Sequence, residues 1–133
     1  MSDRMTAAEW NQTRPKAKRR DIEGPIHKGI LEYVQLLLPS AVIHHSPNEV
    51  DMAGKEVAKA IAKARFLGTR KGWPDLEFIL DGRAYFLEVK VPGNGLSEDQ
   101  AQVFDELRLQ GCKCALVSSL QDVYKALVLW GLI

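Results

Sequence analysis

The sequence is poor in the residues that build cross-linked or zinc-bound domains. It has only two cysteines, Cys112 and Cys114, and three histidines. The cysteines lie two positions apart in an expected strand. They neither make a disulfide framework nor combine with the histidines at any usual spacing for a four-ligand zinc site. We therefore expect both cysteines to be buried apolar residues in a reducing compartment.

Long apolar stretches and a large excess of either charge are also missing. No segment approaches the length of a membrane span, and the N-terminus lacks the apolar core of a signal peptide, so we predict a cytoplasmic protein. The formal net charge is only +1, which by itself does not indicate a nucleic-acid partner. The cations are nevertheless clustered. Residues 14–20 form one basic run, and a second zone contains Lys55, Lys59, Lys63, Arg65, Arg70 and Lys71.

What remains is enough for one folded domain. The chain has 133 residues, 46% of them hydrophobic, which suffices for one core but not for two ordinary ones. Residues 1–20 are polar and basic without clear periodicity, so we predict a flexible basic arm. Residues 21–133 are predicted to form the domain.

The order of the expected elements predicts an α/β fold. Asp21 is a plausible helix N-cap, Pro25 would fall in the first turn, and Ile26, Ile30 and Val34 repeat at helical spacing toward Pro39. Further elements are a strand at 41–45, a helix at 55–66, a hairpin at 76–91, a helix from 97 to 111, a strand at 113–118 and a final helix capped by residue 119. This order indicates a mixed sheet flanked by helices.

The hairpin carries the chemistry. Asp81-Gly82 is a preferred pair for a two-residue turn between strands. With these as the turn residues, Leu80 faces Arg83, and the ladder continues to Asp75 opposite Glu88. Two carboxylates placed directly across a strand pair have Cβ atoms roughly 5 Å apart and repel each other.

A divalent cation removes that repulsion, because hard cations prefer clustered carboxylate oxygens. Lys90 lies two positions after Glu88, on the same face of the strand, where its ammonium group would hold a phosphate or a water nucleophile. The alternative is a Glu88–Lys90 surface pair at a solvated sheet edge, a common arrangement of little energetic weight. The acid at Asp75 on the opposite strand favours a metal site.

These residues resemble a known family. Gly72-Trp73-Pro74-Asp75, followed by Glu88-Val89-Lys90 and by Gln100 in the next helix, is similar to the PD-(D/E)XK nucleases, and more narrowly to the small stand-alone VRR-NUC enzymes of phages and prophages. The resemblance runs from about Glu23 to Val128 and includes a Pro-Asn loop and a Leu-Ser-x-x-Gln helix start. The Val-Arg-Arg tripeptide that names the family is absent. The resemblance implies a restriction-endonuclease-like fold with an αβββαβ-type core.

The resemblance also implies roles for single residues. Asp75, Glu88 and the backbone carbonyl of Val89 would bind Mg²⁺ or Mn²⁺, and Glu23 would complete the metal shell directly or through water. Lys90 would orient or help deprotonate the attacking water and stabilise charge on the phosphate. Independently, Glu23 shares the inward face of its helix with Ile26, although an acid there is also favoured by the helix dipole.

Gln100 also allows two interpretations. It lies on an inward helix face with Val103, Phe104 and Leu107, which suits a site residue, and it is the expected capping-box partner of Ser97. His44 and His45 cannot both face inward on one strand. Either is a possible general base, but a lone strand histidine is more often structural.

Several residues are candidate DNA contacts. Lys55, Lys59 and Lys63 recur every four residues and form one basic stripe on a helix, which suits binding to the DNA backbone without sequence preference. Arg70, Lys71 and Asn48 are further candidates. Their alternatives are solvated cations and, for the Pro-Asn pair, a turn.

The leading hypothesis is a metal-dependent DNA endonuclease. Its action on branched DNA such as Holliday junctions, in a bacterial or phage-infected cytoplasm, is implied by the resemblance alone. Symmetric cutting of a junction needs two active sites and therefore a homodimer, for which the apolar Val128–Ile133 is either an interface or core. The alternatives are a flap, fork or restriction-type nuclease, a non-catalytic DNA-binding module, and a metal-binding structural protein.

Overall fold

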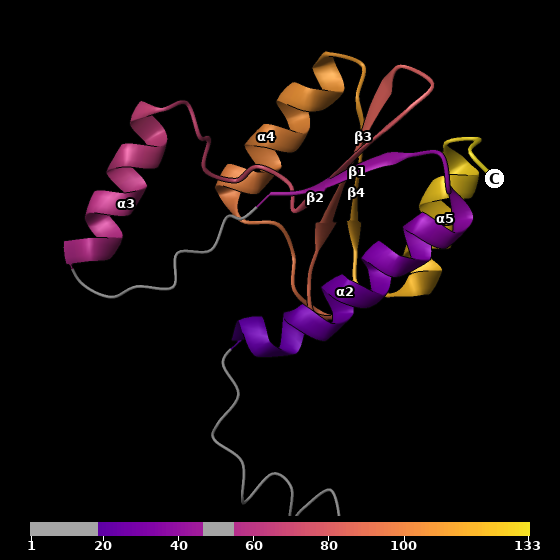
Figure 1. Ribbon diagram of the computed structural model, residues 1–133, viewed down its shortest axis with the longest axis horizontal. Helices are drawn as coiled ribbons and strands as arrows, with labels where there is room; N and C mark the ends of the chain where they lie inside the picture. Colours follow the sequence, from indigo (N-terminus) through magenta and orange to yellow (C-terminus); the bar gives the residue numbers. More distant parts are fainter. Residues whose placement is uncertain (1–18, 47–54) are drawn as a thin grey trace, which may run out of the picture.

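The predicted mixed sheet flanked by helices is present in the computed structural model, which describes residues 19–46 and 55–133 (Figure 1). The strand order is β1-β2-β3-β4, with β1, β2 and β3 antiparallel and β4 parallel to β3. In chain order the elements are α2 (Arg19–Leu37), β1 (Val42–His45), α3 (Lys55–Phe66), β2 (Leu76–Leu80), β3 (Arg83–Val89), α4 (Glu98–Leu109), β4 (Lys113–Val117) and α5 (Leu120–Leu129).

Helix α2 begins earlier than predicted. It starts at Arg19, so Asp21 lies inside the helix instead of capping it, and Pro25 falls beyond the first turn. Arginine is a good helix former, and an acid in the first turn is favoured by the helix dipole, so the two arginines extend the helix. The end of the predicted 1–20 arm therefore belongs to α2. Residues 1–18 lie outside the described residues.

The sheet has a different core on each face. On one face, α2 and α5 cover a large cluster that includes Ile30, Phe78, Leu87 and Leu127. On the other face, α4 covers a smaller cluster of Phe86, Phe104 and Cys114, with Trp73 and Cys112 packed against it. Cys114 is buried, Cys112 is half-buried, and both are free thiols, so they are apolar packing residues as expected. Glu88 lies on the α4 side by strand alternation, since it is two positions from Phe86.

The hairpin has the predicted register. Asp81 and Gly82 both have positive φ angles, 52° and 76°, as a type I′ turn requires. Leu80 pairs with Arg83, and the ladder continues residue by residue to Leu76 opposite Leu87. One further step along the same ladder places Asp75 opposite Glu88.

Helix α3 has the predicted bounds but stands apart from the sheet (Figure 1). Most of its described side chains are exposed, on both its basic and its apolar positions. Within the described parts of the chain, no helix combines the length and the apolar character needed to cross a membrane.

Candidate active site

Asp75 is held from two sides at the end of the sheet. Its Oδ2 accepts a hydrogen bond of 2.9 Å from the backbone N–H of Val89 on β3. Its backbone carbonyl accepts a hydrogen bond of 2.8 Å from the N–H of Ser46, directly after β1. The carboxylate is therefore fixed beside the backbone of Glu88 and Val89, as the predicted register requires.

Glu88 is a buried acid whose carboxylate meets the start of α4. Its residue is only 2% exposed. Its Oε1 accepts a hydrogen bond of 3.4 Å from Nε2 of Gln100. A carboxylate withdrawn from water in this way loses hydration, so a polar or cationic neighbour is needed to stabilise its charge. The sheet thus brings one buried and one half-buried acid, Glu88 and Asp75, to the same end of β2 and β3.

Gln100 forms the predicted capping box and also contacts the buried acid. Its Oε1 accepts from the N–H of Ser97 at 2.9 Å, and its own N–H donates to Oγ of Ser97 at 3.2 Å, which completes the capping box. The amide nitrogen remains available on the other side and donates to Glu88. One side chain therefore closes the N-terminus of α4 and orients the buried acid.

Lys90 continues the strand beyond its assigned end. β3 ends at Val89, not at Val91 as predicted, but the N–H of Lys90 donates to the carbonyl of Val117 at 3.0 Å. This bond extends the parallel pairing with β4 by one residue and keeps the alternation of β3. Lys90 is half-buried and follows Glu88 by two positions, which places both residues on one face.

The loop before Asp75 is tied to α4. Gly72 has φ +87°, and a Cβ atom there would lie 2.6 Å from the carbonyl carbon and oxygen of Asp99. Lys71 Nζ lies 3.1 Å from Oδ2 of Asp99 in a partly exposed ion pair. The close approach of the two backbones therefore requires glycine at this position, in a conformation that other residues rarely adopt.

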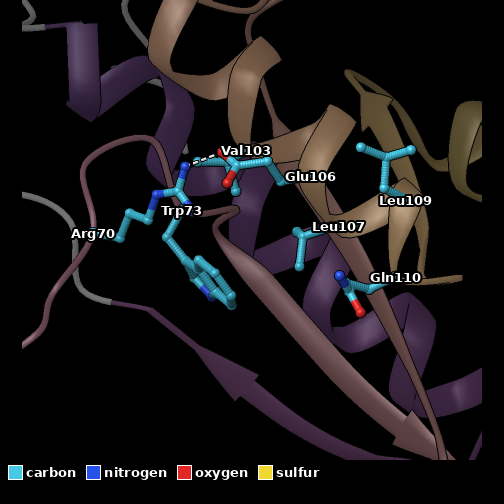
Figure 2. Close-up of a pocket in the computed structure, with 7 residues that line it drawn as sticks. All are labelled: Arg70, Trp73, Val103, Glu106, Leu107, Leu109 and Gln110. Carbon is cyan, nitrogen blue, oxygen red and sulfur yellow. Dashed lines mark hydrogen bonds and ion pairs between the residues drawn. The ribbon is translucent and has the colours of Figure 1, made fainter.

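A second ion pair holds the same loop further along α4. Figure 2 shows Arg70 joined to Glu106 beside Trp73, at a pocket of about 390 Å³. The hydrogen bond between the two side chains raises the pKa of Arg70 and lowers that of Glu106. Trp73 packs edge-on against Phe86, with ring centroids 5.6 Å apart. Arg70 and Lys71 were both predicted to contact DNA. In the structure they are paired with acids of α4.

Sequence reasoning missed these loop contacts and one pair of histidines. His45 packs edge-on against His27 with ring centroids 4.4 Å apart, and its Nδ1 lies 3.2 Å from the carbonyl oxygen of Asp75. Both strand histidines are exposed, but only His45 makes these contacts, which supports a structural function for it. The only signal in the sequence for the loop contacts was the glycine before Trp73-Pro74; nothing in the periodicity of α2 indicated the histidine pair.

Three predicted residues are placed only in part or not at all. Glu23 lies in α2 and Lys55 begins α3, but neither side chain is among those described. Asn48 lies outside the described residues. Lys59 and Lys63 are exposed on α3, as a DNA-binding stripe requires.

The donor atoms at the site suit a hard cation. Asp75 and Glu88 supply carboxylate oxygens, the protein ligands through which Mg²⁺ is usually held. No group of three or more His, Cys, Asp or Glu side chains with a metal-binding arrangement occurs among the side chains that the structure describes. Two carboxylates completed by water fit the sparing use of protein ligands by Mg²⁺.

The family model of the VRR-NUC domain matches residues 26–121, a segment that contains Asp75, Glu88, Lys90 and Gln100. The chain belongs to the VRR-NUC domain family. It is therefore a nuclease-type domain for DNA processing, and the resemblance seen in its motifs is confirmed.

Two solved structures agree with the VRR-NUC fold. One, a VRR-NUC domain protein, has a TM-score of 0.61 at 20% sequence identity, covering 90% of this chain and 91% of the other. The second, a VRR-NUC domain, has a TM-score of 0.54 at 23% identity, covering 80% of this chain and 92% of the other. A search of curated proteins finds no match. At these identities the structures establish the fold, which is the predicted one.

Proposed function

We propose that this VRR-NUC domain is a divalent-metal-dependent endonuclease that hydrolyses phosphodiester bonds in DNA, with Asp75, Glu88 and Lys90 at its active site. One observation carries the proposal. The Asp75 carboxylate accepts the N–H of Val89 across the β2–β3 ladder, immediately beside the buried Glu88. Two carboxylates placed this close repel each other in the absence of a cation. A divalent cation binds readily between them because it removes this repulsion.

Asp75, Glu88 and the carbonyl of Val89 would hold Mg²⁺ or Mn²⁺, with Glu23 as a further acid directly or through water. A bound ion would supply Lewis-acid polarisation of the phosphate and a more acidic water molecule. The chain's own residues do the rest. Val89 and Gln100 orient the two acids through the N–H and Nε2 hydrogen bonds, and Gln100 acts as a positioning residue.

Lys90 would act on the nucleophile and the phosphate. Its ammonium group shares the face of Glu88, where it would orient or help deprotonate the attacking water and stabilise the charge that develops on the phosphate. A fixed positive charge acts strongly in a site shielded from bulk water, and both Lys90 and Glu88 are at least half-buried.

The basic residues of α3 and of the loop before Asp75 would bind the DNA backbone. Lys59 and Lys63 are exposed on α3, where the predicted stripe also includes Lys55. Arg70 and Lys71 would exchange their carboxylate partners for phosphates, since both ion pairs are partly exposed and cost little to open. Asn48 is proposed as a further contact.

Branched DNA as the substrate and a homodimer as the active form belong to the proposal. The C-terminal segment leaves apolar surface for an interface: Leu129 is 83% exposed and Val128 and Ile133 are also exposed, while Trp130 and Leu132 pack against the core. A cytoplasmic location in a bacterium, or in a phage-infected cell, remains a prediction.

Cleavage assays on matched substrates test the proposal. Linear, flap, fork and four-way DNA of one sequence are incubated with Mg²⁺, Mn²⁺ or EDTA. We expect cleavage with either metal, none in EDTA, and preference for the four-way form. Asp75→Asn and Glu88→Gln should abolish cleavage but retain binding, and Lys90→Ala should also abolish it. Lys113→Ala, an exposed lysine at the far end of β4, is the control and should cleave normally.

Other outcomes distinguish the alternatives. DNA that is bound but uncut under every condition would identify a non-catalytic binding module. Preferred cutting of linear duplex would favour a restriction-type enzyme, and preferred cutting of the flap or fork would assign the domain to those substrates. Absence of any DNA interaction would overturn the proposal.

A further inference from the structure

A pair of apolar side chains is exposed at the end of α3. Phe66 is 88% exposed and Leu67 is 70% exposed, and they are adjacent in the chain. The N–H of Leu67 bonds to Lys63 and that of Gly68 to Arg65, with Gly68 at φ +99°, so the pair sits on a defined helix end. Exposed apolar groups that are held in place, instead of folding back onto the core, indicate a surface for a ligand.

The surroundings of this pair are purely cationic in sequence. Residues 57–74 contain no Asp or Glu and carry the five cations Lys59, Lys63, Arg65, Arg70 and Lys71. The first three are exposed on α3 itself. Aromatic and basic residues together provide stacking surfaces for bases and contacts for phosphates, which is the combination used to bind unpaired nucleic acid.

The pair is also connected to the site by an anchored loop. Phe66 and Asp75 are nine positions apart in the chain, so the two lie at most roughly 30 Å apart, less than one turn of duplex DNA. The Arg70–Glu106 and Lys71–Asp99 ion pairs and the close approach of Gly72 fix the second half of this loop to α4. Figure 1 shows α3 projecting from the body of the domain at the start of this loop.

We infer that Phe66 and Leu67 form a wedge that stacks on an unstacked base at a branch point of DNA while the phosphate of a neighbouring nucleotide occupies the Asp75–Glu88 site. This wedge rests on the proposed function and would explain how the domain distinguishes branched DNA from continuous duplex. In a continuous duplex every base is stacked, and opening a step costs free energy. At a junction, fork or flap the stack is interrupted, so exposing a base there costs less than within a continuous duplex, and the wedge favours branched DNA.

A second copy of the chain is a poorer partner for the same surface. Two copies meeting through α3 would bring their exposed cations Lys59, Lys63 and Arg65 together, and like charges repel. A polyanion with flat apolar bases complements both properties of the surface.

Binding measurements test the inference apart from cleavage. In an Asp75→Asn background, which prevents cutting, the affinities for a labelled four-way junction and for a duplex of the same length are compared. Phe66→Ala should weaken junction binding about tenfold and duplex binding less than twofold. Phe66→Trp should retain the preference. Leu36→Ala, which removes a side chain 74% exposed on α2, is the control and should change neither affinity.

A fluorescent base reports the contact directly. 2-Aminopurine at the branch point should change its emission when the Asp75→Asn protein binds, and Phe66→Ala should remove that change. In sedimentation without DNA, the parent protein and Phe66→Ala should have the same oligomeric state. Equal weakening of junction and duplex binding, an unchanged fluorescence response, or loss of a dimer in Phe66→Ala would overturn the wedge. Cleavage by the parent protein that persists in that case would leave the proposed function intact.

Discussion

At the scale of single residues, Gln100 links the N-terminus of α4 to the buried acid Glu88. Its carbonyl oxygen completes the capping box with Ser97, and its amide nitrogen bonds to Glu88. A capping box satisfies two backbone N–H groups that the helix otherwise leaves unpaired. The same side chain therefore contributes to folding and to the orientation of a proposed metal ligand, and substitutions are needed to separate the two effects.

Ser97→Ala and Gln100→Ala should differ in activity more than in stability. Each removes one of the two hydrogen bonds of the capping box and should lower the free energy of unfolding by about 1 kcal/mol. Only Gln100→Ala also removes the hydrogen bond to Glu88, so we expect it to lower kcat at least tenfold, while Ser97→Ala retains most activity. Urea unfolding and steady-state cleavage on one DNA substrate measure both quantities. Equal loss of kcat in the two variants would show that Gln100 acts only through the helix.

Cys114 makes the stability of the domain depend on pH, independently of the candidate active site. Burial raises the pKa of its thiol to about 11, from an ordinary value near 9. Between these values the folded chain keeps a proton that the unfolded chain has lost, so stability is full below pH 9 and falls as the pH rises toward 11. Urea unfolding from pH 8 to 11 should show a shallower fall in Cys114→Ala than in the parent. Cys112→Ala, which alters the half-buried neighbour, should keep the steeper fall.

At the scale of elements, the hairpin was predictable because one dipeptide determines its geometry. Asp81-Gly82 adopts the two positive φ angles of a type I′ turn, and a two-residue turn leaves a single register for both strands. The position of Asp75 opposite Glu88 followed from counting. The capping box of α4 and the bounds of α3 were predictable for the same reason: they depend on residues close in sequence.

Features that depend on distant contacts were not predictable in the same way. The start of α2 was mispredicted for a different, local reason: good helix formers and the helix dipole extend it to Arg19, although Asp21 is a residue type that often caps helices. The pairing of Arg70 with Glu106 joins residues 36 positions apart, and only the folded chain brings them together. The amphipathic pattern of α3 does not reveal that the helix stands away from the sheet, because an apolar stripe usually predicts a buried face.

The loop between α3 and β2 should be sensitive to one methyl group. Gly72→Ala places a Cβ atom 2.6 Å from the backbone of Asp99, so the loop must separate from α4. We expect a loss of roughly 3 kcal/mol in the free energy of unfolding and a large fall in cleavage, because Asp75 follows three residues later. Gly82→Ala is the matched control. Its φ is also positive, at +76°, but no atom lies within 4 Å, so it should cost only roughly 1 kcal/mol and retain activity.

Thermal unfolding and cleavage of both variants check this prediction. The comparison holds backbone strain constant and changes only the contact with α4. Similar losses in the two variants would show that φ alone, and not the approach of Gly72 to Asp99, sets the position of the loop.

At the scale of the whole molecule, the site is expected to reduce the stability of the metal-free domain. The sheet places Asp75 beside Glu88, which is 2% exposed, so folding brings two negative charges together and withdraws one from water. Apolar packing on both faces of the sheet must offset this cost. A cation that binds the folded site stabilises the entire domain, since binding to the folded state alone shifts the unfolding equilibrium.

Glu88→Gln should therefore have opposite effects with and without metal. In EDTA it removes the buried charge, keeps an oxygen that can accept from Gln100, and should raise Tm by roughly 3–5 °C, equivalent to about 1 kcal/mol for a domain of this size. Mn²⁺ at a hundredfold excess over its Kd should stabilise the parent by about 2.7 kcal/mol and leave Glu88→Gln almost unchanged.

Glu98→Gln, at an exposed position on α4, should behave like the parent in both buffers. Calorimetry of the three proteins measures these shifts. A Glu88→Gln protein that melts below the parent in EDTA would mean that the carboxylate is stabilised without a cation, and the two acids would then be a structural pair.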